Sequence, residues 1–172
     1  MNSLKVLVDW LLETVGCPHP GPASAAALDE LRNHGVPEPL IDVYGVVGSD
    51  IPGLLPDPHE LATVALLPPE AVCRHTKTAL RGSQPCPFAT SDLGSWAFDP
   101  DGTLVWWEGG TRTPAGPLHE VLERHLGRLR SGVLVYDPVS DTFRAPPESR
   151  AFLSALEGLT DEPERSPAAS RR

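Results

Sequence analysis

The sequence, 172 residues long, is short of positive charge. Its 14 lysines and arginines stand against 23 aspartates and glutamates, so its formal net charge is −9 at pH 7. A chain this acidic is repelled by a phosphate backbone, and no cluster of Lys or Arg interleaved with aromatic residues runs through it. Both absences argue against a nucleic-acid ligand.

Cysteine and long apolar runs are also scarce. The three cysteines, Cys17, Cys73 and Cys86, have irregular spacing, and an odd number at such spacing does not read as a disulfide framework. We therefore expect a reducing compartment and a cytoplasmic protein. Asp9 and Glu13 interrupt the apolar N-terminal stretch, which argues against a signal peptide. No run of about 18 uncharged apolar residues predicts a membrane span.

Proline and glycine limit the length of the elements. Twenty prolines and fifteen glycines are scattered without a period, so we expect short helices and strands joined by many turns. The chain length fits one domain with extensions. We predict a single domain over residues 1–160, with its core at 24–130 and an extension at 131–160, followed by a disordered tail at 161–172.

Apolar residues three and four positions apart predict helices at both ends of this domain. The first covers 4–15, with Asn2 or Ser3 as its cap, and the second covers 24–33, capped by Ser24. Further helices are predicted at 37–46, with a proline in the first turn, at 118–130 and at 148–159. Residues 68–79 have the pattern of one or two helical turns, and strands are predicted at 61–67, 133–136 and 142–143.

A β-hairpin is predicted at 95–108 (SWAFDPDGTLVWWE). Asp-Pro-Asp-Gly suits a type I turn followed by a left-handed glycine, which closes a three-residue loop at 100–102. That loop pairs Trp96 with Trp106 and Phe98 with Leu104. Because side chains alternate between the faces of a strand, these four residues share one face, and we predict that they enter the core.

Three parts of the sequence together resemble the SUKH superfamily. They are 35–48 (GVPEPLIDVYGVVG), 87–105 (PFATSDLGSWAFDPDGTLV) and the helix containing Leu122 and Leu126. The resemblance spans about residues 24–130 and leaves 132–159 outside it.

The resemblance implies an α+β fold in which N-terminal helices pack on an antiparallel β-sheet, here with a C-terminal helical extension. Members of the superfamily are similar to a fungal cell-wall assembly regulator, and many bacterial members are immunity proteins. It therefore implies a non-enzymatic protein without a cofactor that binds and neutralises a bacterial toxin. An intracellular adaptor or regulatory binding module of the same fold is the alternative, and an enzyme of unrecognised type is a third hypothesis.

Cysteine and histidine offer candidate chemistry that the sequence only weakly supports. Cys17-Pro-His19 and Cys73-Arg-His75 contain zinc-binding residue types, but their spacing matches no finger or ribbon, and buried structural cysteines are the alternative. Cys86 follows Gln84-Pro, as in half of a zinc-deaminase motif, yet position 89 is alanine where a second cysteine is required. Cys86 could act as a nucleophile only beside a base, for which the candidates are His59, His75 and His119.

Acidic residues near the hairpin have a simpler interpretation. Asp92, Asp99 and Asp101 could be read as a calcium loop or a carboxylate pair. Turn residues that bond their own backbone explain Asp99 and Asp101 better.

The acidity is concentrated in the N-terminal part. Residues 1–70 contain Lys5 and Arg32 against ten acids, whereas residues 71–160 contain nine basic and ten acidic residues. We predict a negative patch that attracts a basic protein partner such as a nuclease, formed by Asp42, Asp50, Asp57 and Glu60. A solvated surface that maintains solubility is the alternative.

Trp107 is a second candidate partner contact. In the predicted register it points away from Trp96 and Trp106, and an exposed tryptophan is a frequent interface anchor. Packing beneath a helix is the alternative.

Overall fold

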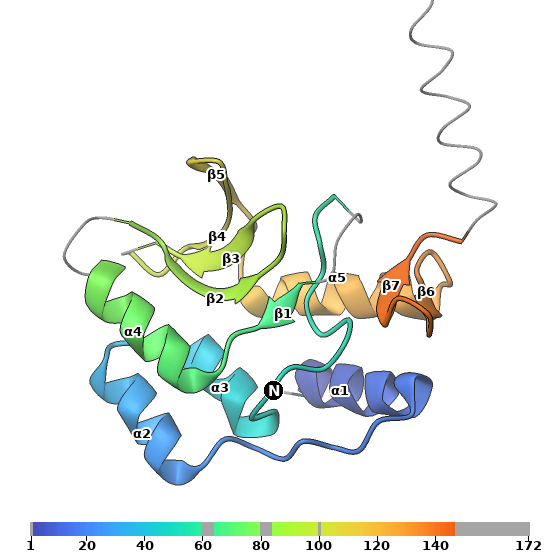
Figure 1. Cartoon of the computed structure of the whole chain (residues 1–172), viewed down its shortest axis with the longest axis horizontal. Coiled ribbons are helices and arrows are strands. Elements are labelled where there is room, and N and C mark those ends of the chain that lie inside the picture. Colours follow the sequence, from blue (N-terminus) through green and yellow to red (C-terminus); the bar gives the residue numbers. More distant parts are fainter. Residues whose placement is uncertain (1, 60–63, 80–83, 100, 147–172) are drawn as a thin grey trace, which may run out of the picture.

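The computed structural model describes residues 2–59, 64–79, 84–99 and 101–146. Within them the chain is a mixed α+β fold, with helices leading into an antiparallel sheet, as predicted (Figure 1). The helices are α1 (Asn2–Val15), α2 (Ala25–Asn33), α3 (Glu38–Val46), α4 (Pro69–Ala79) and α5 (Leu118–Arg130). The strands are β1 (Ala65–Leu66), β2 (Cys86–Thr90), β3 (Ser95–Phe98), β4 (Leu104–Glu108), β5 (Thr111–Pro114), β6 (Val135–Asp137) and β7 (Thr142–Arg144).

Helices α2 and α3 follow the predicted boundaries to within one residue, whereas α1 begins two residues earlier than predicted. Ser24 caps α2, because its side-chain oxygen accepts the N–H of Ala27 at 3.2 Å. The predicted cap of α1 is wrong, since Asn2 and Ser3 both lie inside the helix. The Ser3 hydroxyl instead donates to Glu123 Oε1 at 2.5 Å, which connects α1 with α5.

Helix α4 is longer than the one or two turns predicted. It has eleven residues, which make about three turns. Val72, Cys73 and Thr76 are buried along one side of it, and α4 packs against β2. Prolines at 68 and 69 do not oppose the helix, because the first N–H groups of a helix have no partner within it.

The main sheet is a meander in the order β1-β2-β3-β4-β5, with every neighbouring pair antiparallel. The predicted hairpin and its register are confirmed, since Trp96 pairs with Trp106 and Phe98 with Leu104. The Gly102 N–H donates to Asp99 O at 2.8 Å, and Gly102 has φ of +85°, a conformation that glycine adopts without strain. Of the predicted strand at 61–67, residues 61–63 lie outside the described residues and 65–66 form β1.

The aromatic face of the hairpin enters the core, as predicted. Trp96, Phe98, Leu104 and Trp106 are each at most 5% exposed. The rings of Trp96 and Trp106 meet edge to face at a centroid distance of 5.4 Å, a favoured aromatic geometry. Burial of each such side chain stabilises the fold by about 1.5–3 kcal/mol.

The remaining elements complete a layer of helices against the sheet. Figure 1 shows α1 and α5 side by side below the sheet and α2 beside α4, and these pairs are in contact. The β6–β7 hairpin follows α5, and Phe143 of β7 lies 6.0 Å from the ring of Trp10 in α1. The helix predicted at 148–159 and the tail at 161–172 lie outside the described residues.

Candidate functional site

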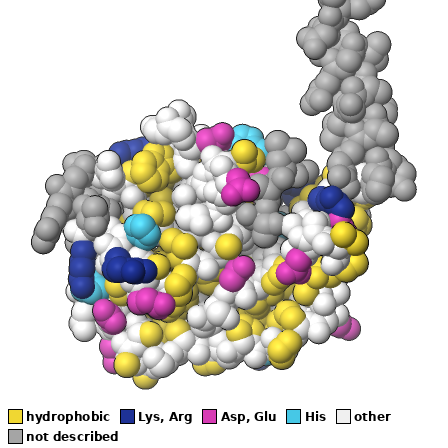
Figure 2. Space-filling view, viewed as in Figure 1, with side chains coloured by type: hydrophobic (Ala, Val, Ile, Leu, Met, Phe, Trp, Pro, Cys, Tyr) yellow, Lys and Arg dark blue, Asp and Glu magenta, His cyan; other side chains and the backbone are white. Residues whose placement is uncertain are grey.

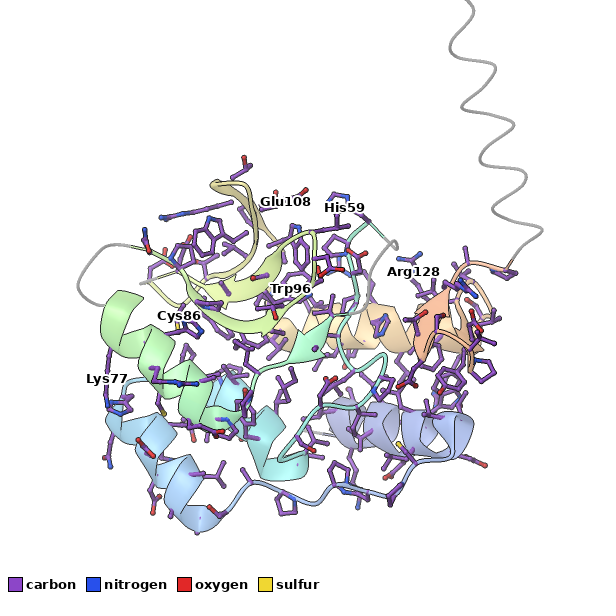
Figure 3. The ribbon with its side chains drawn as sticks, in the orientation of Figure 1. His59, Lys77, Cys86, Trp96, Glu108 and Arg128 are labelled. Carbon is purple, nitrogen blue, oxygen red and sulfur yellow. The ribbon has the colours of Figure 1, made fainter. Side chains whose placement is uncertain are left out.

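A pocket of about 380 Å³ opens between the hairpin, β5 and α5. We call it the indole pocket, because Trp96 and Trp106 form one of its walls. The other walls come from residues 56–59, from Glu108 and 113–115, and from Val121, Arg124, His125 and Arg128 of α5. Figure 3 shows Trp96 below the neighbouring side chains of His59 and Glu108, with Arg128 on α5.

Both tryptophans have their polar atoms occupied within the protein. Trp96 Nε1 donates to the carbonyl of Pro56 at 2.7 Å, and Trp106 Nε1 donates to Glu108 Oε2 at 3.1 Å. These bonds hold the two indoles in place, and the small part of each ring that is not buried in the core faces the pocket. Such a wall suits an apolar or aromatic group.

His59 and Glu108 form a pair at the pocket. His59 Nε2 lies 2.9 Å from Glu108 Oε2, and both side chains are nearly half exposed. The hydrogen bonds from Trp106 and His59 lower the pKa of Glu108 below its ordinary value. A histidine oriented by a carboxylate can transfer a proton. Among the described residues that line the pocket, however, Thr113 supplies the only hydroxyl and no cysteine is present.

His125 is one of the pocket residues that the sequence did not single out, as are Glu108, Arg124 and Arg128. It is 3% exposed on α5, and its Nε2 donates to the carbonyl of Gly53 at 2.7 Å. Its Nδ1 is buried without a hydrogen-bond partner in the part of the chain that the structure describes. Burial lowers the pKa of His125, so the ring is neutral at pH 7. The sequence does contain a signal for its burial, since His125 falls on the apolar face of the helix between Leu122 and Leu126.

Charges of both signs surround the indole pocket. Arg124 and Arg128 lie on the α5 side, and Asp57 and Glu108 lie across from them in the lining. Arg124 Nη2 is 3.4 Å from the carbonyl of Ala115, a weak contact. A binding partner would therefore meet an apolar centre with a mixed polar rim, the usual composition of a protein interface.

The residues predicted to form the acidic patch differ in their exposure, and their contact with a partner stays a prediction. Asp42 is exposed on α3, as expected. Asp57 is only 8% exposed, and its Oδ1 accepts the N–H of His59 at 3.0 Å, so it stabilises the loop and lines the indole pocket. Asp50 is exposed as expected; its Oδ1 also accepts the N–H of Leu66 at 2.8 Å, and desolvation raises its pKa. Glu60 lies outside the described residues. On the face that Figure 2 shows, acidic side chains are scattered over several elements.

Trp107 lies on the sheet face opposite Trp96 and Trp106, as the register predicts. It pairs with Ser95 on one side and Arg112 on the other, and it is partly exposed. Ala97 and Val105 on the same face are buried, so this face is covered at the sheet centre and opens toward Trp107. Contact between Trp107 and a partner stays a prediction.

The cysteines are all free thiols. Cys86 Sγ lies 3.1 Å from Thr76 Oγ1, and burial raises the pKa of its thiol, which disfavours the nucleophilic thiolate. Of its three candidate bases, His59 is paired with Glu108, while His75 and His119 are exposed on their helices. The sequence pairs Cys73 with His75 as possible zinc ligands. In the structure Cys73 lies near Glu30 and His34 instead.

The aspartates of the hairpin act as turn residues. Asp101 Oδ1 accepts the N–H of Thr103 at 2.9 Å, and this bond lowers the pKa of Asp101. Asp99 accepts the N–H of Gly102 through its backbone, and its side chain forms an ion pair with Arg112 at 3.1 Å. The turn interpretation therefore agrees with the side-chain contact of Asp101, whereas the side chain of Asp99 pairs with Arg112 instead of bonding its own backbone.

Comparisons with known proteins give no assignment. No protein-family model matches the chain, and no curated protein matches it. Among the helices of the described residues, none combines the length and the apolar character that crossing a bilayer requires.

Proposed function

We propose that this protein is a non-enzymatic immunity-type protein that binds a cognate bacterial toxin and neutralises it by surface complementarity. The observation that carries the proposal is the indole pocket, with its wall of two fixed tryptophans and its rim of mixed charge. That the partner is a toxin is inferred from the resemblance of residues 24–130 to the SUKH superfamily.

The indole pocket suits an anchoring side chain of a partner protein. Interface hot spots are well-packed, desolvated pockets that receive one large side chain, while the surrounding polar contacts exclude water. The apolar surfaces of Trp96 and Trp106 would pack against that side chain. Glu108 and Arg124 on opposite sides would then fix the orientation of the partner.

The N-terminal acidity would act during the approach of the toxin. Residues 1–70 contain ten acids against two basic residues, and Asp42 presents its carboxylate to solvent on α3. A negative surface accelerates encounter with a basic partner, and a toxin nuclease is such a partner.

The pocket is tested by filling it. Thr113 is an exposed β5 residue that lines the pocket, so Thr113→Trp occupies the space without removing a core side chain. We expect it to weaken binding of the cognate toxin, sought as the product of the neighbouring gene, by roughly tenfold or more, or about 1.4 kcal/mol. Thr111→Trp, on the same strand but outside the lining, is the matched control. Equal affinity of both variants and the wild type would contradict the role of the pocket.

The charge is tested through association kinetics. We expect Asp42→Lys to slow association and to flatten its dependence on salt, while dissociation changes little. Glu120→Lys, an exposed reversal on α5, is the control of equal charge change. An unchanged on-rate for Asp42→Lys would remove the steering role. If the neighbouring gene product does not bind at all, the adaptor alternative takes precedence.

A further inference from the structure

Three metal-binding side chains meet where α2 contacts α4. Glu30 lies in the last turn of α2, and His34, four residues later, is the C-cap of that helix, so the two side chains lie on the same side of it. Cys73 faces them from α4, and one ligand atom from each of the three residues lies within 4.8 Å of the others. This is the one group of its kind among the residues that the structure describes.

The three side chains differ in how firmly they are held. Cys73 is 2% exposed and belongs to the core cluster. His34 is held at the C-terminus of α2, and its Nε2 is 3.6 Å from Glu30 Oε1. Glu30 has the most exposed side chain of the three and can adjust its position. The group therefore has a buried sulfur at its base and a side open to solvent for the entry of an ion.

We propose that Glu30, His34 and Cys73 bind a zinc ion. Thiolate sulfur, imidazole nitrogen and carboxylate oxygen are the three donor types that zinc takes in proteins, and three protein ligands leave a fourth position for water. Tetrahedral zinc requires ligand atoms roughly 3.3–3.7 Å apart, given bond lengths of about 2.0–2.3 Å. The separation of His34 Nε2 from Glu30 Oε1, 3.6 Å, already meets this requirement, and the ligand atoms of all three residues lie within 4.8 Å of one another.

The donor set selects the class of metal. Calcium and magnesium prefer oxygen ligands, whereas a cysteine with a histidine favours zinc and the later transition metals. A bound ion would also join α2 to α4, two helices separated by 35 residues of chain. Binding that requires this arrangement stabilises the folded state. The site lies on elements other than the indole pocket, so the inference stands independently of the toxin.

Cobalt substitution tests the ligands directly. We expect the purified full-length chain to bind Zn²⁺ at one equivalent, and Co²⁺ to give the visible bands of tetrahedral cobalt with a thiolate charge-transfer band. Cys73→Ser should abolish the charge-transfer band. His34→Ala changes a partly exposed side chain, and it should weaken Zn²⁺ binding by more than the ~10–100-fold typical of losing an outer-shell partner.

Two matched variants serve as controls. Cys17→Ser removes a different thiol, and His75→Ala removes the histidine nearest to Cys73 in sequence, which is exposed on α4. Both should retain the bands and the affinity for Zn²⁺. Circular dichroism of each variant without metal establishes that it is folded. A wild-type chain without the bands, or a folded His34→Ala that binds Zn²⁺ as tightly as the wild type, would overturn the proposal.

Discussion

His125 in α5 donates its Nε2 proton to the carbonyl of Gly53 at 2.7 Å. This bond connects the last helix of the main fold to the loop that leads into the wall of the indole pocket. It also determines the tautomer, since a carbonyl can only accept, and so Nδ1 carries the lone pair. The buried ring can bond Gly53 only while it donates, and a second proton on Nδ1 would have no described acceptor.

Acid should therefore destabilise the fold through His125. Its pKa in the folded state is lowered from 6.5 by burial. Below about pH 6.5 the unfolded chain takes up a proton that the folded chain does not, so the free energy of unfolding falls as the pH falls, with a slope approaching 1.4 kcal/mol per pH unit. Above this pH the histidine is neutral in both the folded and the unfolded chain, so the full free energy of unfolding is present there. Urea unfolding at several pH values measures it.

His125→Gln isolates that contribution. Glutamine keeps an N–H that can reach Gly53 but has no proton to gain in this range. We expect its free energy of unfolding to change less than that of the wild type between about pH 7.5 and 5.5. Parallel curves for the two proteins would mean that other groups cause the acid sensitivity.

Gly94→Ala should destabilise the protein by about 1–3 kcal/mol, the usual cost of overpacking. A Cβ at Gly94 would lie 2.8 Å from both Trp106 Cζ2 and the carbonyl oxygen of Trp107, and neither atom belongs to a flexible side-chain end. Thermal and chemical denaturation measure the loss.

Gly45→Ala is the opposite case and serves as the control. Gly45 lies in α3, and a Cβ there would meet nothing within 4 Å. We expect stabilisation by about 0.5–1 kcal/mol, because alanine loses less entropy than glycine on entering a helix. A similar loss in both variants would show that the contact with Trp106 is not the cause.

Trp106→Phe should raise the pKa of Glu108 toward its ordinary value. The indole N–H of Trp106 is the largest cause of the lowered pKa, and phenylalanine cannot donate. A carbon-detected NMR titration of the Glu108 carboxyl group measures the change. Trp107→Phe provides the matched control, since Trp107 makes no described bond to Glu108, and its titration curve should follow that of the wild type.

Trp96→Phe should weaken the connection between the hairpin and the loop at 56–59. The Pro56 carbonyl loses the donor that now lies at 2.7 Å, at a cost of about 1 kcal/mol. We also expect faster amide exchange at His59, the last residue of that loop. Unchanged exchange there, with reduced stability, would place the effect in the core alone.

The hairpin was predictable because its information is local. Asp-Pro-Asp-Gly defines the loop, the loop defines the register, and the register assigns Trp96 and Trp106 to one face. The spacing of the apolar residues in α5 was likewise sufficient to predict that helix and its buried face. The length of α4 was less accessible, because its two prolines at the start suggest a break, while packing against β2 extends the helix.

The candidate site depended on contacts between distant segments. Nothing in the sequence brings His59 to Glu108, 49 residues away, or turns Asp57 inward. The acidic patch was inferred from charge along the chain, and sequence position alone does not determine which carboxylates are exposed. Cys73 was grouped with His75 because the two are close in sequence. Two residues apart in a helix, however, their side chains point to nearly opposite sides, and His34 comes from the end of another helix.

The small β6–β7 sheet has a practical consequence for shortening the protein. Phe143 lies against Trp10 and Tyr136, and it occupies the space that a side chain at Gly53 would need. An expression version that stops before β6 would lose this aromatic cover and expose Trp10 and the loop around Gly53 to water. We expect the shortened protein to aggregate through this exposed apolar surface. A version that extends through Arg144 keeps the aromatic cover in place.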